Sequence, residues 1–372
     1  MLIGVPKEIK SDEYRVGLTP SSVRELVAHG CKVVVESGAG EGIGMPDNAY
    51  QDAGAAIAAD AASVFADAQL VVKVKEPQPV ECAMLRDGQV LFTYLHLAPD
   101  PAQAQALVDS GCIAIAYETV SDSQGGLPLL APMSEVAGRM AVQAGAHSLE
   151  RESGGAGILL GGVAGVPAAN VVVIGGGTVG TNALRVALGM EARVTVIDKS
   201  LPRLNQLDLL FGGGLNTIFA TAEAVDHYVA DADLVVGAVL VPGAEAPKLV
   251  SRNLLARMRP GSVLVDVAID QGGCFETSRA TTHSNPTYIE EHVVHYCVAN
   301  MPGAVPRTST YALNNATLPY VLALARRGYP RALLEHSGLR DGLNVHCGQI
   351  THPAVAEALG YPYVPPVDAM RV

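Results

Sequence analysis

Short apolar runs rich in β-branched residues alternate with stretches of helical periodicity along most of the chain. In the first third, this pattern predicts strands at residues 2–5, 32–35, 70–74, 90–95 and 112–117. The helical stretches between them cover residues 21–29, 49–58, 61–66, 80–85 and 101–108. Because strands alternate with helices, the pattern is typical of a doubly wound parallel sheet with helices on both faces.

A second alternating set follows later in the chain. Its strands are expected at residues 171–174, 194–197, 217–219, 234–238, 263–267 and 294–298. Two longer helical stretches flank this set, and we expect both to cross between two domains. Residues 132–150 have Ser134 as a candidate N-cap. Residues 308–327 have an apolar side made of Tyr311, Leu318, Val321, Leu322 and Leu324.

The turn after residues 171–174 carries the most specific signal in the chain. Gly175, Gly177 and Gly180 have the spacing G-x-G-x-x-G, and Thr178 then opens a helix rich in Ala and Leu. In a dinucleotide-binding βαβ unit, such glycines make the turn, let the backbone approach a pyrophosphate and let helix and strand pack closely. The phosphates bind the N–H groups at the helix N-terminus. The motif therefore predicts a dinucleotide site.

The strand that follows this motif ends in Asp198. Folds of this kind place a carboxylate there to bind the hydroxyls of the adenosine ribose. A carboxylate accepts hydrogen bonds from a diol and repels a phosphate, so NAD is favoured over NADP. Binding of NADP stays an alternative, because the nearby cations Lys199 and Arg203 could tolerate its 2′-phosphate.

Length and pattern together predict an α/β protein with two doubly wound parallel-sheet (Rossmann-like) domains joined by long crossing helices. A chain of 372 residues exceeds what one hydrophobic core usually supports. The glycine motif assigns an NAD-binding Rossmann domain to residues 129–306. The substrate domain is then discontinuous and comprises residues 1–128 plus 307–372.

Polar residues follow the expected strands of the first domain. They are Lys7, Glu8, Glu36, Lys75, Glu76, His96 and Glu118. Because ligands of open α/β sheets bind outside the carboxyl ends of the strands, these positions predict a polar cleft. Taken singly, most of them are more simply solvated strand ends. Lys75 and His96 are the better functional candidates, since both lie directly after an apolar strand.

Composition narrows the classes of function. Hydrophobic residues make up 49% of the chain and charged residues 17%, which predicts a large buried interior. The formal net charge of −12 argues against a nucleic acid partner, because a basic surface is needed to displace counterions. The six cysteines are far apart and form no C-x-x-C pair, so we expect buried thiols in a reducing cytoplasm.

Two further features bear on location. The N-terminus already has the pattern of a strand that ends in charges, so no signal peptide is expected. Residues 154–184 carry no charge and are long enough to span a bilayer. They also contain ten glycines, Pro167 and the dinucleotide turn, so a buried loop, strand and helix start explain them better. We therefore expect a cytoplasmic protein without a membrane partner.

Six sequence motifs follow one another along the chain. They are GVPKEIK from Gly4 continued by EYRVGLTP from Glu13, KVKEP from Lys73, YLHLA from Tyr94, APMSE from Ala131, VAIDQGG from Val267 and ANMPG from Ala299. Together they are similar to the signatures of the alanine dehydrogenase family, which the chain resembles along nearly its whole length. The resemblance implies NAD-dependent oxidative deamination of L-alanine to pyruvate and ammonia, the reverse reaction, and a homohexamer.

The resemblance also implies roles for four residues near the reacting carbon. Arg15 would hold the substrate carboxylate, for which a guanidinium fork is the natural partner. Lys75 would bind the carbonyl or amino end of the substrate, and His96 would be the general acid and base. Asp270 would orient or activate the attacking water or ammonia. The plainer interpretations are a surface arginine in a loop for Arg15 and a cap or turn carboxylate for Asp270.

The resemblance implies a set of NAD-binding residues as well. They are Ser134, Gly175, Gly177, Thr178, Val179, Gly180, Asp198, Arg203, Val239, Leu240, Val267, Ala268, Ile269, Asp270, Val298, Ala299, Asn300 and Met301. Ala220 stands where a hydroxyl near the adenine ribose would be expected, which puts that contact in question. No metal is expected, because the grouped side chains Glu291, His292, His295 and His283 match no ligand motif.

Two other functions stay open. The fold and several of the six motifs are shared with the nucleotide-binding part of proton-translocating transhydrogenases. A soluble subunit of that kind would bind NAD and pass hydride to a partner protein. A non-catalytic protein would only sense NAD. The presence of Arg15, Lys75 and His96 favours the dehydrogenase.

Overall fold

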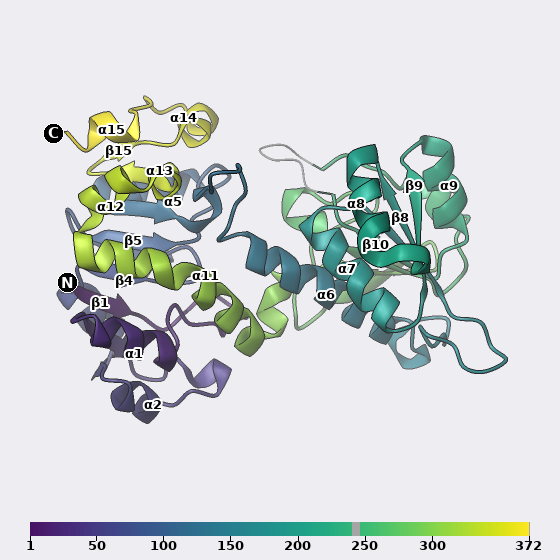
Figure 1. Cartoon of the computed structure of the whole chain (residues 1–372), viewed down its shortest axis with the longest axis horizontal. Helices are drawn as coiled ribbons and strands as arrows, with labels where there is room; N and C mark the ends of the chain where they lie inside the picture. The colour runs from purple at the N-terminus through teal and green to yellow at the C-terminus, as the bar shows by residue number, and fades with distance from the viewer. Residues whose placement is uncertain (240–245, 372) are drawn as a thin grey trace. The chain divides into compact units, whose positions relative to one another are not determined.

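The chain forms two compact units in a computed structural model that describes residues 1–239 and 246–371. The first unit comprises Met1–Met133 and Val305–Val372, and the second comprises Ser134–Ala304 (Figure 1). Both termini of the chain therefore belong to the first unit. Leu240, one of the expected cofactor residues, lies outside the described residues.

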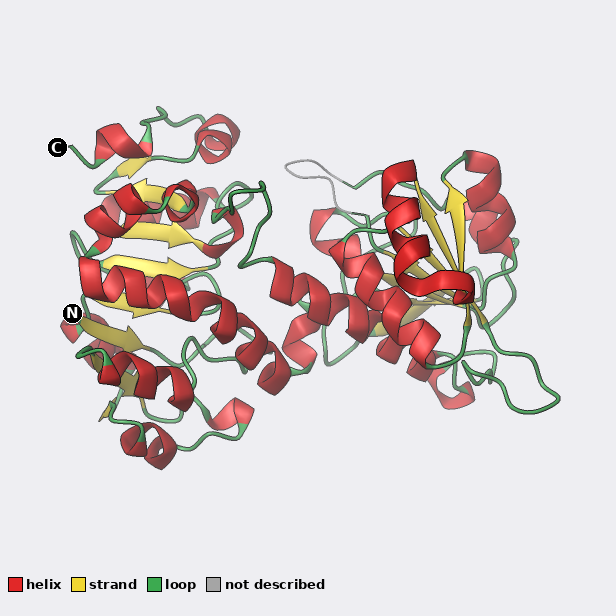
Figure 2. Ribbon diagram, viewed as in Figure 1, coloured by secondary structure: helices red, strands yellow, loops and turns green. Residues whose placement is uncertain are grey.

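The first unit contains a mixed sheet with the strand order β15-β14-β6-β5-β4-β1-β2-β3 among the described residues. Its parallel strands are β1 (Leu2–Val5), β2 (Lys32–Glu36), β3 (Ala56–Ala58), β4 (Leu70–Val72), β5 (Val90–Thr93) and β6 (Ile113–Ala116). Two antiparallel strands extend it, β14 (Leu343–His346) and β15 (Gln349–Ile350). Figure 2 shows these strands in yellow with helices around them.

The helices of the first unit come from both ends of the chain. They are α1 (Pro20–Ala28), α2 (Asp47–Asp52), α3 (Ala61–Asp67), α4 (Pro79–Cys82), α5 (Pro101–Ser110), α11 (Pro306–Arg327), α12 (Tyr329–Glu335), α13 (Ser337–Asp341), α14 (Pro353–Leu359) and α15 (Pro366–Ala369). Several start at side-chain caps: Thr19, Asp60 and Asp100 each accept from a backbone N–H of the first helical turn.

The second unit contains a sheet with the order β12-β13-β11-β10-β7-β8-β9. Its parallel strands are β7 (Asn170–Ile174), β8 (Arg193–Asp198), β9 (Leu215–Phe219), β10 (Leu234–Gly237), β11 (Val263–Asp266) and β13 (Val293–Tyr296), and β12 (Thr287–Glu290) is antiparallel. Its helices are α6 (Ala131–Ser148), which begins in the first unit, α7 (Thr178–Gly189), α8 (Leu201–Phe211), α9 (Ala222–Ala230) and α10 (Arg252–Leu255).

Strand β7 shows why this sheet is covered on both faces. Val171 and Val173 belong to one hydrophobic cluster, which includes side chains of α6, α7 and α8. Val172 and Ile174 belong to another cluster, with side chains of α9 and α10. Because successive residues of a strand point to opposite faces, both faces of the sheet are buried. The predicted α/β class with parallel-dominated sheets is thus confirmed.

Some expected elements were wrong in detail. The helix predicted over residues 49–58 ends early, as α2 stops at Asp52 and β3 follows. Pairing of β3 with β2 overrides the helical propensity of the alanines there. Ser134 is not an N-cap, because α6 already begins at Ala131, where Pro132 fits the first helical turn.

The antiparallel strands at the ends of the two sheets, β12, β14 and β15, were not foreseen. Strand β14 has the sequence Leu-Asn-Val-His and is fully buried, so it shows no clear alternation of apolar and polar residues. Strand β12 is half-exposed and separated from β13 only by the turn at Glu291 and His292, which have positive φ angles. Short strands of this kind depend on pairing with a sheet that already exists.

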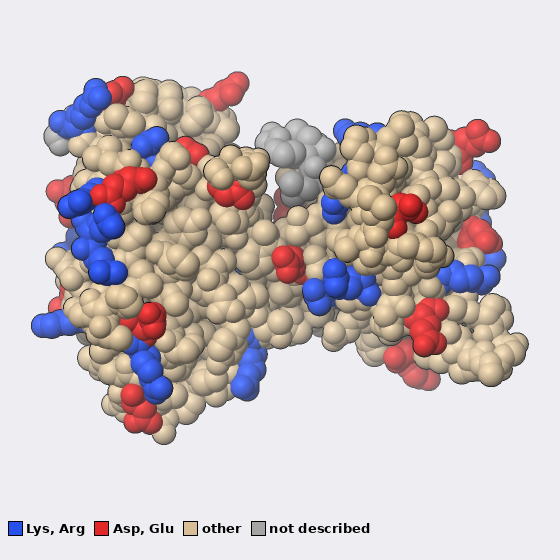
Figure 3. All heavy atoms as spheres, in the orientation of Figure 1, with Lys and Arg blue, Asp and Glu red and all other residues tan. Residues whose placement is uncertain are grey.

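The uncharged run at residues 154–184 folds into loops, β7 and the start of α7. No helix within the described residues is long and apolar enough to cross a membrane. On the face drawn in Figure 3, charged side chains lie singly or in small groups of mixed sign among a larger uncharged surface.

Two leucines of the second unit offer a matched test of core packing. Leu234 is fully buried in β10, whereas Leu209 on α8 is 86% exposed. Leu234→Ala is expected to lower the free energy of unfolding by about 2–5 kcal/mol, because it leaves a cavity. Leu209→Ala should change it by less than about 0.5 kcal/mol. Chemical denaturation of both variants checks this, and equal effects would contradict the packing described.

Candidate active site

The carboxyl edge of the first sheet gathers the polar residues that follow its strands. The backbone N–H of Lys7, after β1, donates to Glu36 Oε2 at 2.7 Å, at the end of β2. The N–H of His96, after β5, donates to Glu118 Oε1 at 2.6 Å, after β6. Parallel strands end at the same edge, so residues far apart in sequence meet there.

Arg15 is buried, with 2% of its surface exposed, so it is not a surface arginine. Its Nε and Nη2 donate to the two carboxylate oxygens of Glu13 at 2.7 and 2.6 Å, and Nη1 lies 3.1 Å from Met133 Sδ. Burial alone would raise the pKa of Glu13, but the hydrogen bonds and charge of Arg15 outweigh it and lower that pKa. The pair is therefore ionised and fixes the guanidinium plane.

Helix α11 holds the loop that carries Arg15. Asn314 Nδ2 donates to the carbonyl of Gly17 at 2.8 Å, and Asn314 Oδ1 accepts from the N–H of Thr19 at 3.0 Å. Thr310 Oγ1 accepts from the N–H of Val16 at 3.3 Å. The buried face of α11 thus includes polar groups. Of its expected apolar side, Val321 and Leu324 are buried, whereas Leu318 and Leu322 are only half-buried.

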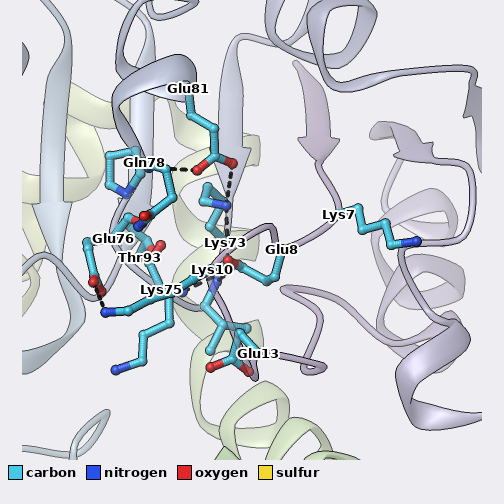
Figure 4. Close-up of polar contacts among 12 residues, drawn as sticks. Lys7, Glu8, Lys10, Glu13, Lys73, Lys75, Glu76, Gln78, Glu81 and Thr93 are labelled. Atoms are coloured by element: carbon cyan, nitrogen blue, oxygen red, sulfur yellow. Dashed lines mark hydrogen bonds and ion pairs between the residues drawn. The ribbon is translucent and has the colours of Figure 1, made fainter. Parts of the chain in front are cut away.

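Lys75 lies in the turn after β4 and is half-buried. Its N–H donates to Glu8 Oε1 at 3.3 Å, and its carbonyl accepts from the Thr93 hydroxyl at 2.8 Å. The charge of Lys75 adds to the effect of Arg15 on the Glu13 carboxyl, so all three groups are electrostatic neighbours. In Figure 4, Lys75 and Glu13 extend on the same side of the buried cluster.

His96 is exposed at the end of β5 and has a φ of 50°, in the left-handed region. Few side chains adopt this conformation, and it marks positions held by their surroundings. The imidazole stacks on Tyr94 with ring centroids 5.9 Å apart. Tyr94 is buried, donates to the carbonyl of Leu129 at 2.5 Å and is an electrostatic neighbour of Arg15.

The glycine turn of the second unit has the geometry of a phosphate-binding loop. A Cβ on Gly180 would lie 1.9 Å from the Gly175 carbonyl oxygen, so only glycine lets α7 pack this closely on the turn. Gly175 itself has a φ of 100°. A Cβ on Gly177 would meet nothing within 4 Å, so the start of α7 faces open space. The residues present therefore fit a pyrophosphate at the helix N-terminus.

Asp198 and Arg203 both bind this loop. Asp198 accepts from the N–H groups of Gly176 at 2.6 Å and Ser200 at 2.8 Å. Arg203 donates from Nε to the Gly176 carbonyl and from Nη2 to the Thr181 hydroxyl, both at 2.6 Å. The carboxylate thus lies beside the glycine turn at the end of β8, where it can accept from a ribose diol.

The other expected cofactor residues lie at the carboxyl ends of β10, β11 and β13 or in α6. They are Ser134 in α6, Val239 after β10, Val267, Ala268, Ile269 and Asp270 in a short 3₁₀ turn, and Val298, Ala299, Asn300 and Met301 after β13. Asp270 is exposed, and it belongs to the second unit with the rest of this set.

Asp266, which sequence reasoning did not select, caps the turn that carries Asp270. It accepts from the N–H groups of Ala268 at 3.0 Å and Cys274 at 2.8 Å. Burial raises the pKa of Asp266, although these hydrogen bonds oppose the shift. Its only signal in the sequence is a carboxylate at the end of an apolar strand.

His283, Glu291 and His295 contact other protein groups. His295 is buried, and its Nε2 lies 2.8 Å from the Thr277 hydroxyl. His283 Nε2 lies 3.1 Å from the Asn300 carbonyl oxygen, and Glu291 forms an ion pair with Arg252 at 3.2 Å.

Comparison with known families decides where the chain belongs. Residues 4–137 match the N-terminal domain of alanine dehydrogenase/PNT, and residues 141–353 match the C-terminal domain of the same family. The chain belongs to the alanine dehydrogenase/PNT family. Membership implies a nicotinamide dinucleotide cofactor, in agreement with the glycine turn.

Several members of this family are similar to the chain over its full length. An alanine dehydrogenase from Halomonas elongata is 62% identical, covering 98% of both chains. Those from Bacillus subtilis and Mycobacterium tuberculosis are 56% and 53% identical, covering all of this chain and 98% and 100% of theirs. A solved L-alanine dehydrogenase superposes with a TM-score of 0.94 at 51% identity, covering 97% of this chain and 99% of that one.

A transhydrogenase from Sinorhizobium meliloti also has this fold. It superposes with a TM-score of 0.81 at 26% identity, covering 95% of this chain and all of that one. Both values are lower than for the alanine dehydrogenase. Within the family, the comparisons therefore favour the dehydrogenase branch.

The buried Glu13–Arg15 pair predicts how stability depends on pH. Because the pKa of Glu13 is lower in the folded chain, its ionisation stabilises the fold above the unfolded-state pKa, and this stability is lost as pH falls through the folded-state value. Glu13→Gln should lower the free energy of unfolding by about 3–5 kcal/mol at neutral pH. Denaturation from pH 7 to pH 3 should show the gap to the wild type shrinking below about pH 4.5.

Glu41→Gln is the matched control, because the Glu41 carboxylate is exposed and its ion pair with Lys7 is long, at 4.0 Å. It should change stability by less than about 0.5 kcal/mol. A gap for Glu13→Gln that is independent of pH would show that the charge of Glu13 does not hold Arg15.

Proposed function

We propose that the chain catalyses the NAD-dependent oxidative deamination of L-alanine to pyruvate and ammonia, and the reverse reductive amination. The observation that carries this proposal is the full-length identity of 53–62% to proteins named alanine dehydrogenase. The gathering of Arg15, Lys75 and His96 in the first unit supports it. That unit is then the substrate domain, and the second unit is the NAD-binding domain.

Arg15 and Lys75 bind the substrate in this proposal. The Arg15 guanidinium is already oriented by Glu13, so it needs little reordering to pair with a carboxylate. The Lys75 ammonium binds the carbonyl oxygen of pyruvate or the amino end of alanine. Two fixed cations would orient the substrate, and such positioning can lower a barrier by about 7–11 kcal/mol.

His96 and Asp270 move and orient protons. When bound, the nicotinamide ring supplies the acceptor for the hydride that leaves Cα of alanine. Water held by Asp270 then attacks the resulting iminium carbon, and His96 takes the proton. His96 returns the proton as the carbinolamine releases ammonia. An exposed imidazole suits this exchange, because it can pass the proton on to water.

NAD is preferred over NADP because the Asp198 carboxylate would repel a 2′-phosphate. The cofactor is held by Ser134, by the turn from Gly175 to Gly180, by Arg203 and by the loops after β10, β11 and β13. Cytoplasmic location and a homohexamer complete the proposal. The location is supported by six free cysteines, five of which are buried, and the hexamer rests on the resemblance alone.

Substitutions at two glycines test folding and cofactor binding separately. Gly180→Ala places a Cβ 1.9 Å from the Gly175 carbonyl oxygen and should prevent normal folding of the second unit. Gly177→Ala meets no protein atom within 4 Å and should fold normally, but its methyl group occupies the space of the pyrophosphate. NADH affinity should fall by about tenfold or more. Circular dichroism and NADH fluorescence check this; normal NADH affinity in Gly177→Ala would contradict the cofactor site.

The reaction itself is tested by NADH formation with L-alanine. The purified protein should reduce NAD with L-alanine, but reduce NADP or react with D-alanine far more slowly. His96→Ala and Lys75→Met should reduce kcat/KM by about 100-fold or more, with NADH binding retained. Binding of NADH without turnover, in either direction, would instead support a sensor.

A further inference from the structure

Glu8, Lys73 and Glu81 form a buried triad of ions beside the Lys75 turn (Figure 4). Their side chains are at most 2% exposed. Lys73 Nζ donates to Glu8 Oε2 at 3.0 Å and to Glu81 Oε1 at 2.6 Å. Replacing buried ions by apolar residues of similar size often leaves the free energy of unfolding unchanged or increases it. Stability alone therefore does not explain why this chain buries three charged side chains here.

Glu8 contacts three successive residues of the turn. Its Oε2 accepts from the Lys73 ammonium, and its Oε1 accepts from the N–H of Val74 at 2.7 Å and of Lys75 at 3.3 Å. The Thr93 hydroxyl donates to the Lys75 carbonyl at 2.8 Å. Side chains therefore hold both polar groups of the Lys75 backbone, because this residue lies beyond the end of β4.

Glu81 fixes the other end of the same turn. Its second oxygen, Oε2, accepts from the N–H of Gln78 at 2.7 Å, at the start of α4. Lys73 bridges Glu81 to Glu8, so the chain between β4 and α4 is held at both ends. The carboxylates of Glu8 and Glu81 raise the pKa of Lys73 although burial opposes this, which keeps the bridging ammonium charged.

We propose that Glu8, Lys73 and Glu81 are positioning residues that fix the backbone of Lys75 and thereby the place of its ammonium group in the substrate site. The proposal rests on the proposed role of Lys75 in substrate binding. Glu8 is the decisive member, because its carboxylate accepts from the backbone N–H of Lys75. Thr93 acts with it on the opposite side of the same residue.

Two variants separate positioning from stability. Glu8→Gln keeps the size of the side chain and removes its charge, and it should raise KM for pyruvate by about tenfold, with kcat less affected and NADH affinity unchanged. The triple variant Glu8→Leu, Lys73→Met, Glu81→Leu should regain the thermal stability that Glu8→Gln loses. Its KM should stay high. A KM that returns to the wild-type value together with stability would overturn the proposal.

Lys10→Met and Thr93→Val complete the series. The ion pair drawn for Lys10 in Figure 4 runs to Glu76 and not to the triad, so Lys10→Met should leave KM within about twofold of wild type. Thr93→Val keeps the shape of the side chain and should raise KM, because the Lys75 carbonyl loses its donor. If the triple variant does not fold, Glu8→Gln and Thr93→Val decide the question.

A second measurement does not depend on turnover. Acetic anhydride labels lysine amines, and mass spectrometry can compare Lys75 with the exposed Lys32 as an internal reference. Lys75 should be labelled several-fold faster in Glu8→Gln, because its turn is no longer held. Unchanged labelling would overturn the positioning proposal. A wild-type protein with no alanine or pyruvate turnover would contradict the proposed function instead, and labelling would still test the triad.

Discussion

One buried ammonium group organises the carboxyl edge of the first sheet. Lys73 has no access to water, so carboxylates from other segments must balance its charge. Glu8 comes from the segment after β1 and Glu81 from α4, and the need to pair them with Lys73 brings three parts of the chain together. Because Glu8 is held by this pairing, the loop that follows it and carries Glu13 and Arg15 begins at a fixed point. The Lys75 turn is held by the same carboxylate.

The two units share one geometric principle. In each, polar groups lie just beyond the carboxyl ends of parallel strands, where the backbone is no longer engaged in the sheet. The first unit provides charged side chains there. The second provides backbone N–H groups at the start of α7, with Gly180 allowing the close approach and Asp198 bracing the turn. At this edge the first unit thus presents fixed charged side chains, and the second presents the backbone of a glycine turn.

The family likeness separates fold from function. The transhydrogenase with 26% identity retains the architecture at a TM-score of 0.81, so the sheets and their helices tolerate wide change in sequence. Function depends on particular groups placed on that scaffold. In this chain the proposed function rests on Arg15 with its carboxylate partner Glu13, and on His96 in a left-handed conformation stacked on Tyr94. These are features of individual residues that the fold alone does not require.

The sequence by itself determined the α/β class, all the parallel strands except β3 and the dinucleotide turn. Each depends on local patterns: apolar runs, helical periodicity and the spacing of Gly175, Gly177 and Gly180. Only the tertiary structure decided the edge strands β3, β12 and β15, the adjoining strand β14, the polar buried face of α11 and the partners of Lys73. Asn314 and Glu81 carry no local signal, because their hydrogen bonds reach residues that are close only after the chain has folded. Local propensity determines which helices and strands form. Which polar groups must pair is determined only when segments distant in sequence are buried against one another.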